Sequence, residues 1–201
     1  MTEHRMVTMT RDEAVELMQE YTPSDALRKH MYAVEIAMRA MAERAGEDPD
    51  EWGLVGLLHD FDYERYPNQE HSPTEGHPAE GVRLLAARGL PELMQRAILG
   101  HATYCGVPRD TPMARALFAV DELAGFLVAC ALVRPSRSFK DLELKSVKKK
   151  LKDKTFCEAI DRDALKRAAD DLGVPLDKHI ENVISFLRPV EAKLGLGKAA
   201  K

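Results

Sequence analysis

The stretch GLVGLLHDFDYERYP, residues 53–67, decides how the rest of the chain is interpreted. Its almost continuously apolar first part leads into the adjacent pair His59 and Asp60, two residue types that ligate metal ions. Consecutive side chains on a helix point about 100° apart, so this pair reaches one ion only where a helix ends. We therefore predict a buried helix that presents His59 and Asp60 at its C-terminal end. For an isolated pair, the alternative is an ordinary polar turn.

The segments that precede this pair are predicted to be helical. Ser24 is expected to cap a long helix that runs to Arg44, because apolar residues recur between them at helical spacing. His30 lies on this helix beside the apolar stripe, where a lone histidine is more often a core residue than a ligand. Asp50 is expected to cap the next helix, which leads into His59.

Two further histidines follow at the predicted ends of helices. Residues 66–76 contain two prolines and several small polar residues, a composition typical of a surface loop. His77 follows this loop and precedes Pro78, a residue suited to the first turn of a helix. His101 ends a helix that is predicted to begin at Pro91.

The most apolar segment, residues 113–133, is predicted to be a buried helix and contains Asp121. A carboxylate in such a helix either faces solvent or meets a cation, because burial of an unpaired charge is costly. We predict that Asp121 meets a cation. The longest apolar run, residues 123–133, is too short to cross a bilayer.

The composition is that of an ordinary soluble protein. The chain has 201 residues, enough for one core, and its net charge of −4 gives no reason to expect a nucleic-acid or membrane partner. Three widely spaced cysteines without a C-x-x-C pair argue against a disulfide framework and fit a reducing cytoplasm. Residues 1–18 carry charges throughout, so no signal peptide is predicted there.

Six candidate ligands, two of which are the adjacent pair His59 and Asp60, occupy five places that are each separated from the next by about one helix. They are His30, His59, Asp60, His77, His101 and Asp121. No strand-like alternation is long enough to build a sheet, so the predicted class is all-α. Successive helices of a bundle can deliver such side chains to a common centre.

This order, H…HD…H…H…D, resembles the HD-domain superfamily of metal-dependent phosphohydrolases, in its dinuclear branch. The segments LLHDFDYERYP, ILGHATYCGVP and FAVDELAGF are similar to a bacterial group of predicted HD-superfamily hydrolases. The resemblance covers about residues 24–133 and continues through ALVRPSRS and KSVKKKLKD. One subset of the superfamily has the sequence H-D-I-G, whereas this chain has Asp62 in place of that glycine.

The resemblance implies an all-α HD-domain helical bundle with a C-terminal helical extension. A single HD-type domain is expected over residues 1–201. Its core would cover about residues 24–133, and a basic segment with C-terminal helices would cover about residues 134–195.

The resemblance also implies how two ions would be held. His30, His59, Asp60 and Asp121 would hold one ion, and Asp60 would bridge to a second ion held by His77 and His101. A carboxylate has two oxygens and can bridge, whereas a neutral imidazole offers one lone pair. His71 lies near His77 in the sequence and competes for its role.

The predicted cofactors are two divalent transition-metal ions, since mixed nitrogen and oxygen ligands suit Mn, Fe, Co, Ni or Zn. Two such ions acidify a water and stabilise a phosphoryl group. The predicted reaction is hydrolysis of a phosphoester of a small phosphorylated compound by metal-activated hydroxide, with nucleotides as the first class to screen. Asp60 and Asp62 are the predicted catalytic residues. Asp62 and Glu64 would orient ligands or water, or else are surface charges.

A basic concentration between residues 134 and 154 supplies candidate phosphate-binding groups. We predict this role for Arg134, Lys145, Lys148 and Lys149. The alternative is a solvated helix face.

Two other functions compete with hydrolysis. Some dinuclear members of the superfamily are mixed-valent di-iron oxygenases with the same ligand arrangement, and these require iron and oxygen. A non-catalytic helical regulatory module is the second alternative. A nucleic-acid partner is not expected, because no recognised motif accompanies the lysines and aromatic residues are not interleaved with them. The sequence makes no prediction of oligomeric state.

Overall fold

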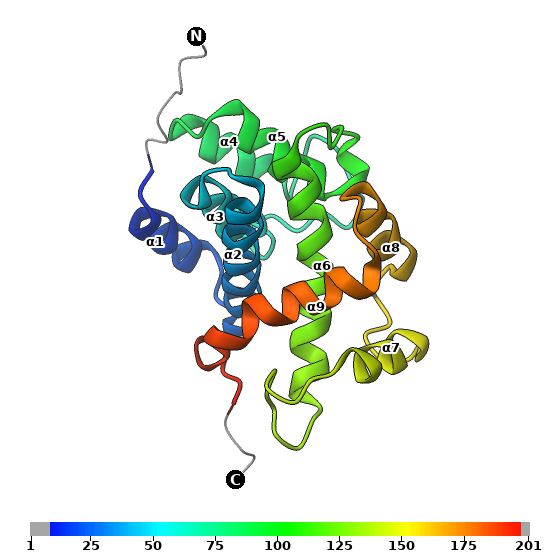
Figure 1. Cartoon of the computed structure of the whole chain (residues 1–201). Coiled ribbons are helices and arrows are strands. Elements are labelled where there is room, and N and C mark those ends of the chain that lie inside the picture. Colours follow the sequence, from blue (N-terminus) through cyan, green and yellow to red (C-terminus); the bar gives the residue numbers. More distant parts are fainter. Residues whose placement is uncertain (1–8, 198–201) are drawn as a thin grey trace. The chain divides into compact units, whose positions relative to one another are not determined.

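The computed structural model describes residues 9–197, which form helices joined by loops and contain no strand (Figure 1). The all-α prediction is therefore confirmed. The elements are α1 (Arg11–Tyr21), α2 (Asp25–Ala45), α3 (Pro49–Leu58), α4 (Ala79–Ala87), α5 (Glu92–His101), η1 (Thr103–Cys105), α6 (Pro112–Leu132), α7 (Leu144–Lys152), α8 (Arg162–Asp171), α9 (Leu176–Leu187) and η2 (Arg188–Leu194), where η denotes a 3₁₀ helix.

The starts of α2 and α3 follow from local capping chemistry. The Ser24 side chain accepts a hydrogen bond from the Leu27 N–H and caps α2, as predicted. The prediction for α3 was wrong by two residues. Asp48 is the N-cap, and its side chain accepts from the Asp50 N–H at 2.8 Å, because Pro49 occupies the first helical position.

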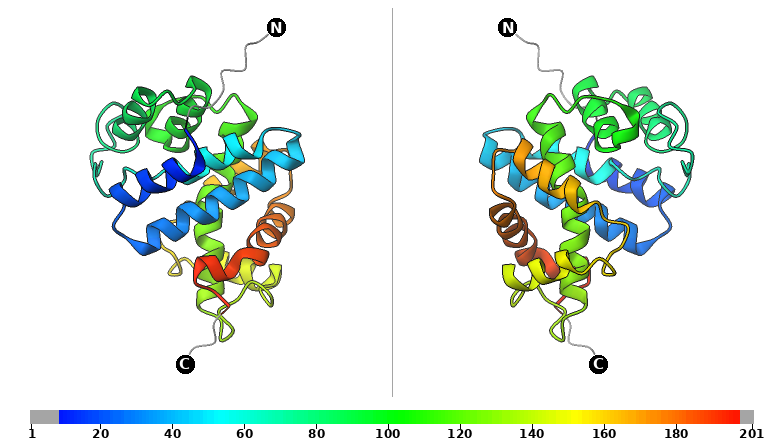
Figure 2. Two further views of the ribbon diagram at one scale, coloured as in Figure 1. Left: turned by 90° about the vertical axis from the view of Figure 1, so that its left-hand side faces the viewer. Right: turned by 90° about the vertical axis from the view of Figure 1, so that its right-hand side faces the viewer.

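The chain divides into two compact units, residues 1–117 and 118–201, and the boundary falls inside α6. In the N-terminal unit α2 packs on α3, and α4 packs on α5 (Figure 2). In the C-terminal unit α9 contacts α7, α8 and η2. No helix within residues 9–197 is both long and apolar enough to span a membrane. The expected single HD-type domain over residues 1–201 stays a prediction.

A buried carboxylate ties together the first three helices of the N-terminal unit. Glu35 on α2 is 3% exposed and accepts from Arg11 Nε of α1 at 2.6 Å and from Arg39 Nε at 3.1 Å. Arg39 also donates to Asp50 of α3 at 2.6 Å. Such a charge is tolerated because it is paired and hydrogen-bonded. The network fixes α2 against α3, the two helices that carry the first candidate ligands.

The C-terminal unit has its own buried polar contacts. Glu191 of η2 accepts from the Ser138 hydroxyl at 2.7 Å and from the Phe139 N–H at 2.8 Å. His179 on α9 donates from Nε2 to the Ala119 carbonyl at 2.9 Å, and burial lowers the pKa of this imidazole. Both side chains are satisfied by protein groups, which indicates structural roles.

Candidate metal centre

Five of the six predicted ligands lie together in the N-terminal unit, and four segments supply them. His30 projects from α2, His59 caps the C-terminal end of α3, Asp60 lies in the following turn, His77 precedes α4 and His101 ends α5. The predicted placement of the His59–Asp60 pair at a helix end is confirmed. At that position the two adjacent side chains turn to the same side.

The carboxylate of Asp60 lies between two pairs of imidazole nitrogens. Its Oδ2 is 3.4 Å from His59 Nε2 and 3.8 Å from His30 Nε2. Its Oδ1 is 3.3 Å from His77 Nε2 and 3.4 Å from His101 Nε2. The ligand atoms within each three-residue group lie within 4.8 Å of one another. Asp60 is therefore shared by two groups that can each hold an ion.

These separations fit transition-metal coordination. Nitrogen and oxygen ligands lie about 2.0–2.2 Å from such an ion, so two ligands at a tetrahedral angle are about 3.4 Å apart. The nitrogen-to-oxygen separations at Asp60 run from 3.3 to 3.8 Å. The donor set of imidazoles and one carboxylate also suits these metals.

Backbone carbonyls orient two of the imidazoles. His59 Nδ1 is 2.8 Å from the Gly56 carbonyl, and His101 Nδ1 bonds the Ile98 carbonyl, in each case three residues earlier on the same helix. A carbonyl can only accept, so each Nδ1 carries the proton and each neutral ring directs the Nε2 lone pair toward Asp60.

His77 is held by side chains rather than by its own helix. Its Nδ1 donates to Asp62 Oδ1 at 2.7 Å, which leaves the Nε2 lone pair facing Asp60. Its carbonyl accepts from Asn68 Nδ2 and from the Tyr104 hydroxyl, both at 2.8 Å. These contacts fix a ligand that no regular element carries.

The protonation pattern leaves acceptors facing one another at the centre. His59, His77 and His101 each present an Nε2 lone pair, and the Asp60 carboxylate only accepts. Burial acts to raise the pKa of Asp60, but His59 and His101, as charged donors in the absence of an ion, outweigh it and hold that pKa well below the ordinary value. When the two imidazoles are neutral, bound metal ions can supply this positive charge instead. A group of acceptors around an ionised carboxylate calls for a cation.

Two of the residues that position His77 were not predicted from the sequence. Asn68 lies within a loop where its hydrogen bonds reach residues four and nine positions later, and no periodic pattern marks such contacts. Gly81 donates its N–H to Asp62 Oδ2 at 2.7 Å. A glycine inside a predicted helix is a usable signal, because glycine is a poor helix former and its presence suggests close packing.

Three further residues that were predicted to act at this site lie outside the two ligand groups. His71 is exposed and stacks on Tyr104, with ring centroids 4.8 Å apart, and lies in neither ligand group among residues 9–197. Glu64 is exposed and accepts from the Ser24 N–H at 3.1 Å. Asp121 is half-buried on α6 in the C-terminal unit, and its role as a ligand stays a prediction.

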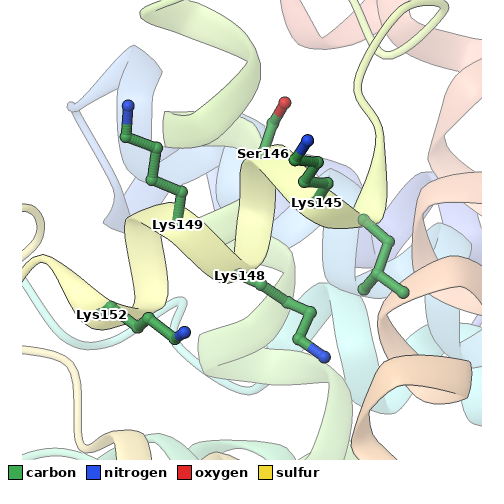
Figure 3. A pocket seen from close by; sticks show the side chains of 6 residues that line it. Lys145, Ser146, Lys148, Lys149 and Lys152 are labelled. Atoms are coloured by element: carbon green, nitrogen blue, oxygen red, sulfur yellow. The ribbon is translucent and has the colours of Figure 1, made fainter.

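A cavity of about 680 Å³ lies along α7 in the C-terminal unit (Figure 3). Its lining residues are Leu144, Lys145, Ser146, Lys148, Lys149 and Lys152. Three of the predicted phosphate-binding residues, Lys145, Lys148 and Lys149, are exposed there, and Lys148 and Lys149 leave the helix in different directions. The cavity is thus a basic surface along one helix.

Two of the four predicted phosphate-binding residues form ion pairs within the C-terminal unit. Lys148 Nζ lies 2.6 Å from Asp177 Oδ2, and Arg134 Nη2 lies 2.8 Å from Asp141 Oδ2. The Arg134 contact helps to lower the pKa of Asp141 to about 2. An anionic ligand would compete with these carboxylates, so Lys145 and Lys149 are better placed to receive one.

Comparison with known proteins identifies one family. Neither a search of curated proteins nor a search of solved structures finds a match. Residues 27–125 match the family model described as HD domain, and this segment includes all six predicted ligands. The match covers just under half of the chain and supports its relation to the HD superfamily.

Proposed function

We propose that the chain is a metal-dependent phosphohydrolase of the dinuclear branch of the HD superfamily. The family match supports metal-dependent hydrolysis as the class of reaction. One observation carries the proposal of two ions: the two oxygens of Asp60 face different pairs of imidazoles. A carboxylate can serve one ion with each oxygen, whereas each imidazole serves one.

Each ligand group would hold one ion. His30, His59 and Asp60 would hold the first, with Asp121 proposed as a further ligand, and Asp60, His77 and His101 would hold the second. When bound, such ions supply Lewis acidity that acidifies water and balances charge on a phosphoryl group. The chain orients its ligands through Nδ1 hydrogen bonds, so that the coordinating nitrogens are preset.

The proposed substrate is a small phosphorylated compound, and nucleotides are the first class to screen. The proposed metals are Mn, Fe, Co, Ni or Zn, since imidazole and carboxylate suit all of them. The proposed location is the cytoplasm, supported by three free cysteines.

The test of this proposal begins with metal content. Protein purified without added metal is analysed by inductively coupled plasma mass spectrometry, and we expect about two transition-metal ions per chain. The loaded protein is then assayed on phosphomonoesters, phosphodiesters and nucleoside triphosphates, with and without oxygen. Turnover that releases phosphate or nucleotide without oxygen is the expected result.

Two outcomes would contradict the proposal. Iron as the main metal, together with oxygen consumption and no hydrolysis, would indicate the di-iron oxygenase. Absence of metal in the purified protein, followed by no uptake of Mn, Fe, Co, Ni or Zn, would leave a non-catalytic helical module.

We further propose that Lys145 and Lys149 bind the phosphate of the substrate. The double variant Lys145→Ala/Lys149→Ala is expected to raise KM about tenfold and leave kcat unchanged, because two exposed ion contacts of up to about 1 kcal/mol each are lost. Steady-state kinetics on the best substrate of the panel measure this. Lys166→Ala, at an exposed position on α8, is the matched control. An unchanged KM in the double variant would show that the lysines of α7 form a solvated helix face and do not bind the substrate.

A further inference from the structure

The carboxylate of Asp62 accepts two hydrogen bonds inside the N-terminal unit. The side chain is 1% exposed, and its two oxygens are 2.7 Å from two different donors. Oδ1 accepts from His77 Nδ1, and Oδ2 accepts from the Gly81 N–H. Because both oxygens are engaged and no face is open, Asp62 is not placed to contact a substrate.

The contact with Gly81 makes Asp62 the cap of α4. The N-cap position of that helix is Pro78, which has no capping side chain, and the first N–H groups of a helix lack partners within it. Asp62 supplies the missing acceptor from a turn 19 residues earlier. One carboxylate therefore fixes both the start of α4 and the imidazole that precedes it.

Gly81 leaves the room that this arrangement needs. A Cβ at residue 81 would lie 2.5 Å from Asp62 Cγ and 2.7 Å from Oδ2. Such separations do not occur between non-bonded atoms, so any side chain at this position would displace the carboxylate. This requirement explains why a glycine occurs inside α4, although glycine has one of the lowest helix propensities.

The three oriented imidazoles are not held alike. His59 and His101 donate to neutral backbone carbonyls, whereas His77 donates to a carboxylate. A charged acceptor makes a stronger hydrogen bond and raises the basicity of the opposite ring nitrogen. His77 belongs to the group formed by Asp60, His77 and His101.

We propose that Asp62 is a positioning residue for the second ion: it holds His77 as a ligand, and Gly81 holds Asp62 in place. The proposal rests on the dinuclear site of the proposed function. It assigns part of the affinity for the ion at Asp60, His77 and His101 to the hydrogen bond between Asp62 and His77.

The test compares Asp62→Asn with the wild type by titration of the metal-free protein with Co²⁺, followed by absorption spectroscopy and calorimetry. Asparagine has the same shape, but its single carbonyl oxygen can accept from only one of His77 and Gly81. We expect one of two binding events to weaken by about 10–100-fold, as for other partners of metal-bound histidine, and the other to keep its affinity. Glu70→Gln, which neutralises an exposed carboxylate in the neighbouring loop, is the control and should leave both affinities unchanged.

Gly81→Ala is the second variant, because it displaces the carboxylate without neutralising it. The same selective loss is expected. Thermal unfolding of each metal-free variant separates this effect from a loss of fold, because an unfolded variant would bind both ions more weakly.

Two results would overturn the inference. One is that Asp62→Asn binds both ions with wild-type affinity. The other is that the folded variant binds both ions more weakly by the same factor. A wild type that binds no metal would instead contradict the proposed function, so the two failures are distinguishable.

Discussion

Replacement of Asp60 with alanine is expected to reduce bound metal from about two ions per chain to about zero. Oδ2 of Asp60 faces the imidazoles of His30 and His59, and Oδ1 faces those of His77 and His101. Removal of one side chain therefore takes a ligand from both groups at once. Hydrolysis should fall to background, and mass spectrometry of the purified variant measures the metal.

His101→Ala is the informative comparison for this prediction. It removes a ligand from the second group alone, so about one ion should remain. Asp110→Asn, at an exposed carboxylate that pairs with Arg96 at 3.3 Å, should retain both ions. Two ions in Asp60→Ala would show that Asp60 does not bridge.

The second large effect is expected for Gly56→Ala, which should destabilise the protein by about 1–3 kcal/mol through overpacking. A Cβ at residue 56 would lie 2.9 Å from the Glu35 Cα and N and from the Val34 carbonyl oxygen. These are backbone atoms of α2, so α3 itself would have to move. Since the Gly56 carbonyl also orients His59, the shift should weaken metal binding as well.

Urea denaturation of the metal-free protein measures the free energy of unfolding for this variant. Gly100→Ala is the matched control, because a Cβ at that helical position would meet the Arg109 Cγ at 3.4 Å and the Val107 carbonyl oxygen at 3.6 Å, both ordinary contacts. Helix propensity then predicts a neutral change or a gain of up to about 1 kcal/mol. Equal destabilisation of both variants would contradict the close approach of α3 to α2.

Much of the fold followed from periodicity and helix-end chemistry, since both are local. The predicted helix from Ser24 to Arg44 differs from α2 by about one residue. The last of the C-terminal helices changes type along its length, because the α-helix ends at Leu187 and a 3₁₀ helix continues to Leu194. Apolar spacing alone does not separate these two helix types over a short segment.

The candidate ligands were visible in the sequence because the side chains that ligate metals are few and lie at helix ends. The groups that orient them were less visible. The contacts of Asp62 with His77 and Gly81 join residues 15 and 19 positions apart across an irregular loop, and no spacing rule predicts them. The boundary between the two compact units follows Leu117 inside α6, and no break in that helix marks it in the sequence.

The way in which α3 and α5 end has an electrostatic consequence. Both helices reach the metal centre at their C-terminal ends, through His59 and His101. The C-terminal end of a helix carries a partial negative charge of about half an elementary charge, which favours cations and opposes anions. Together with the Asp60 carboxylate, this field should repel a phosphate group from the metal-free protein. Metal ions are therefore expected to bind first, and the substrate only after their charge has reversed the sign of the potential.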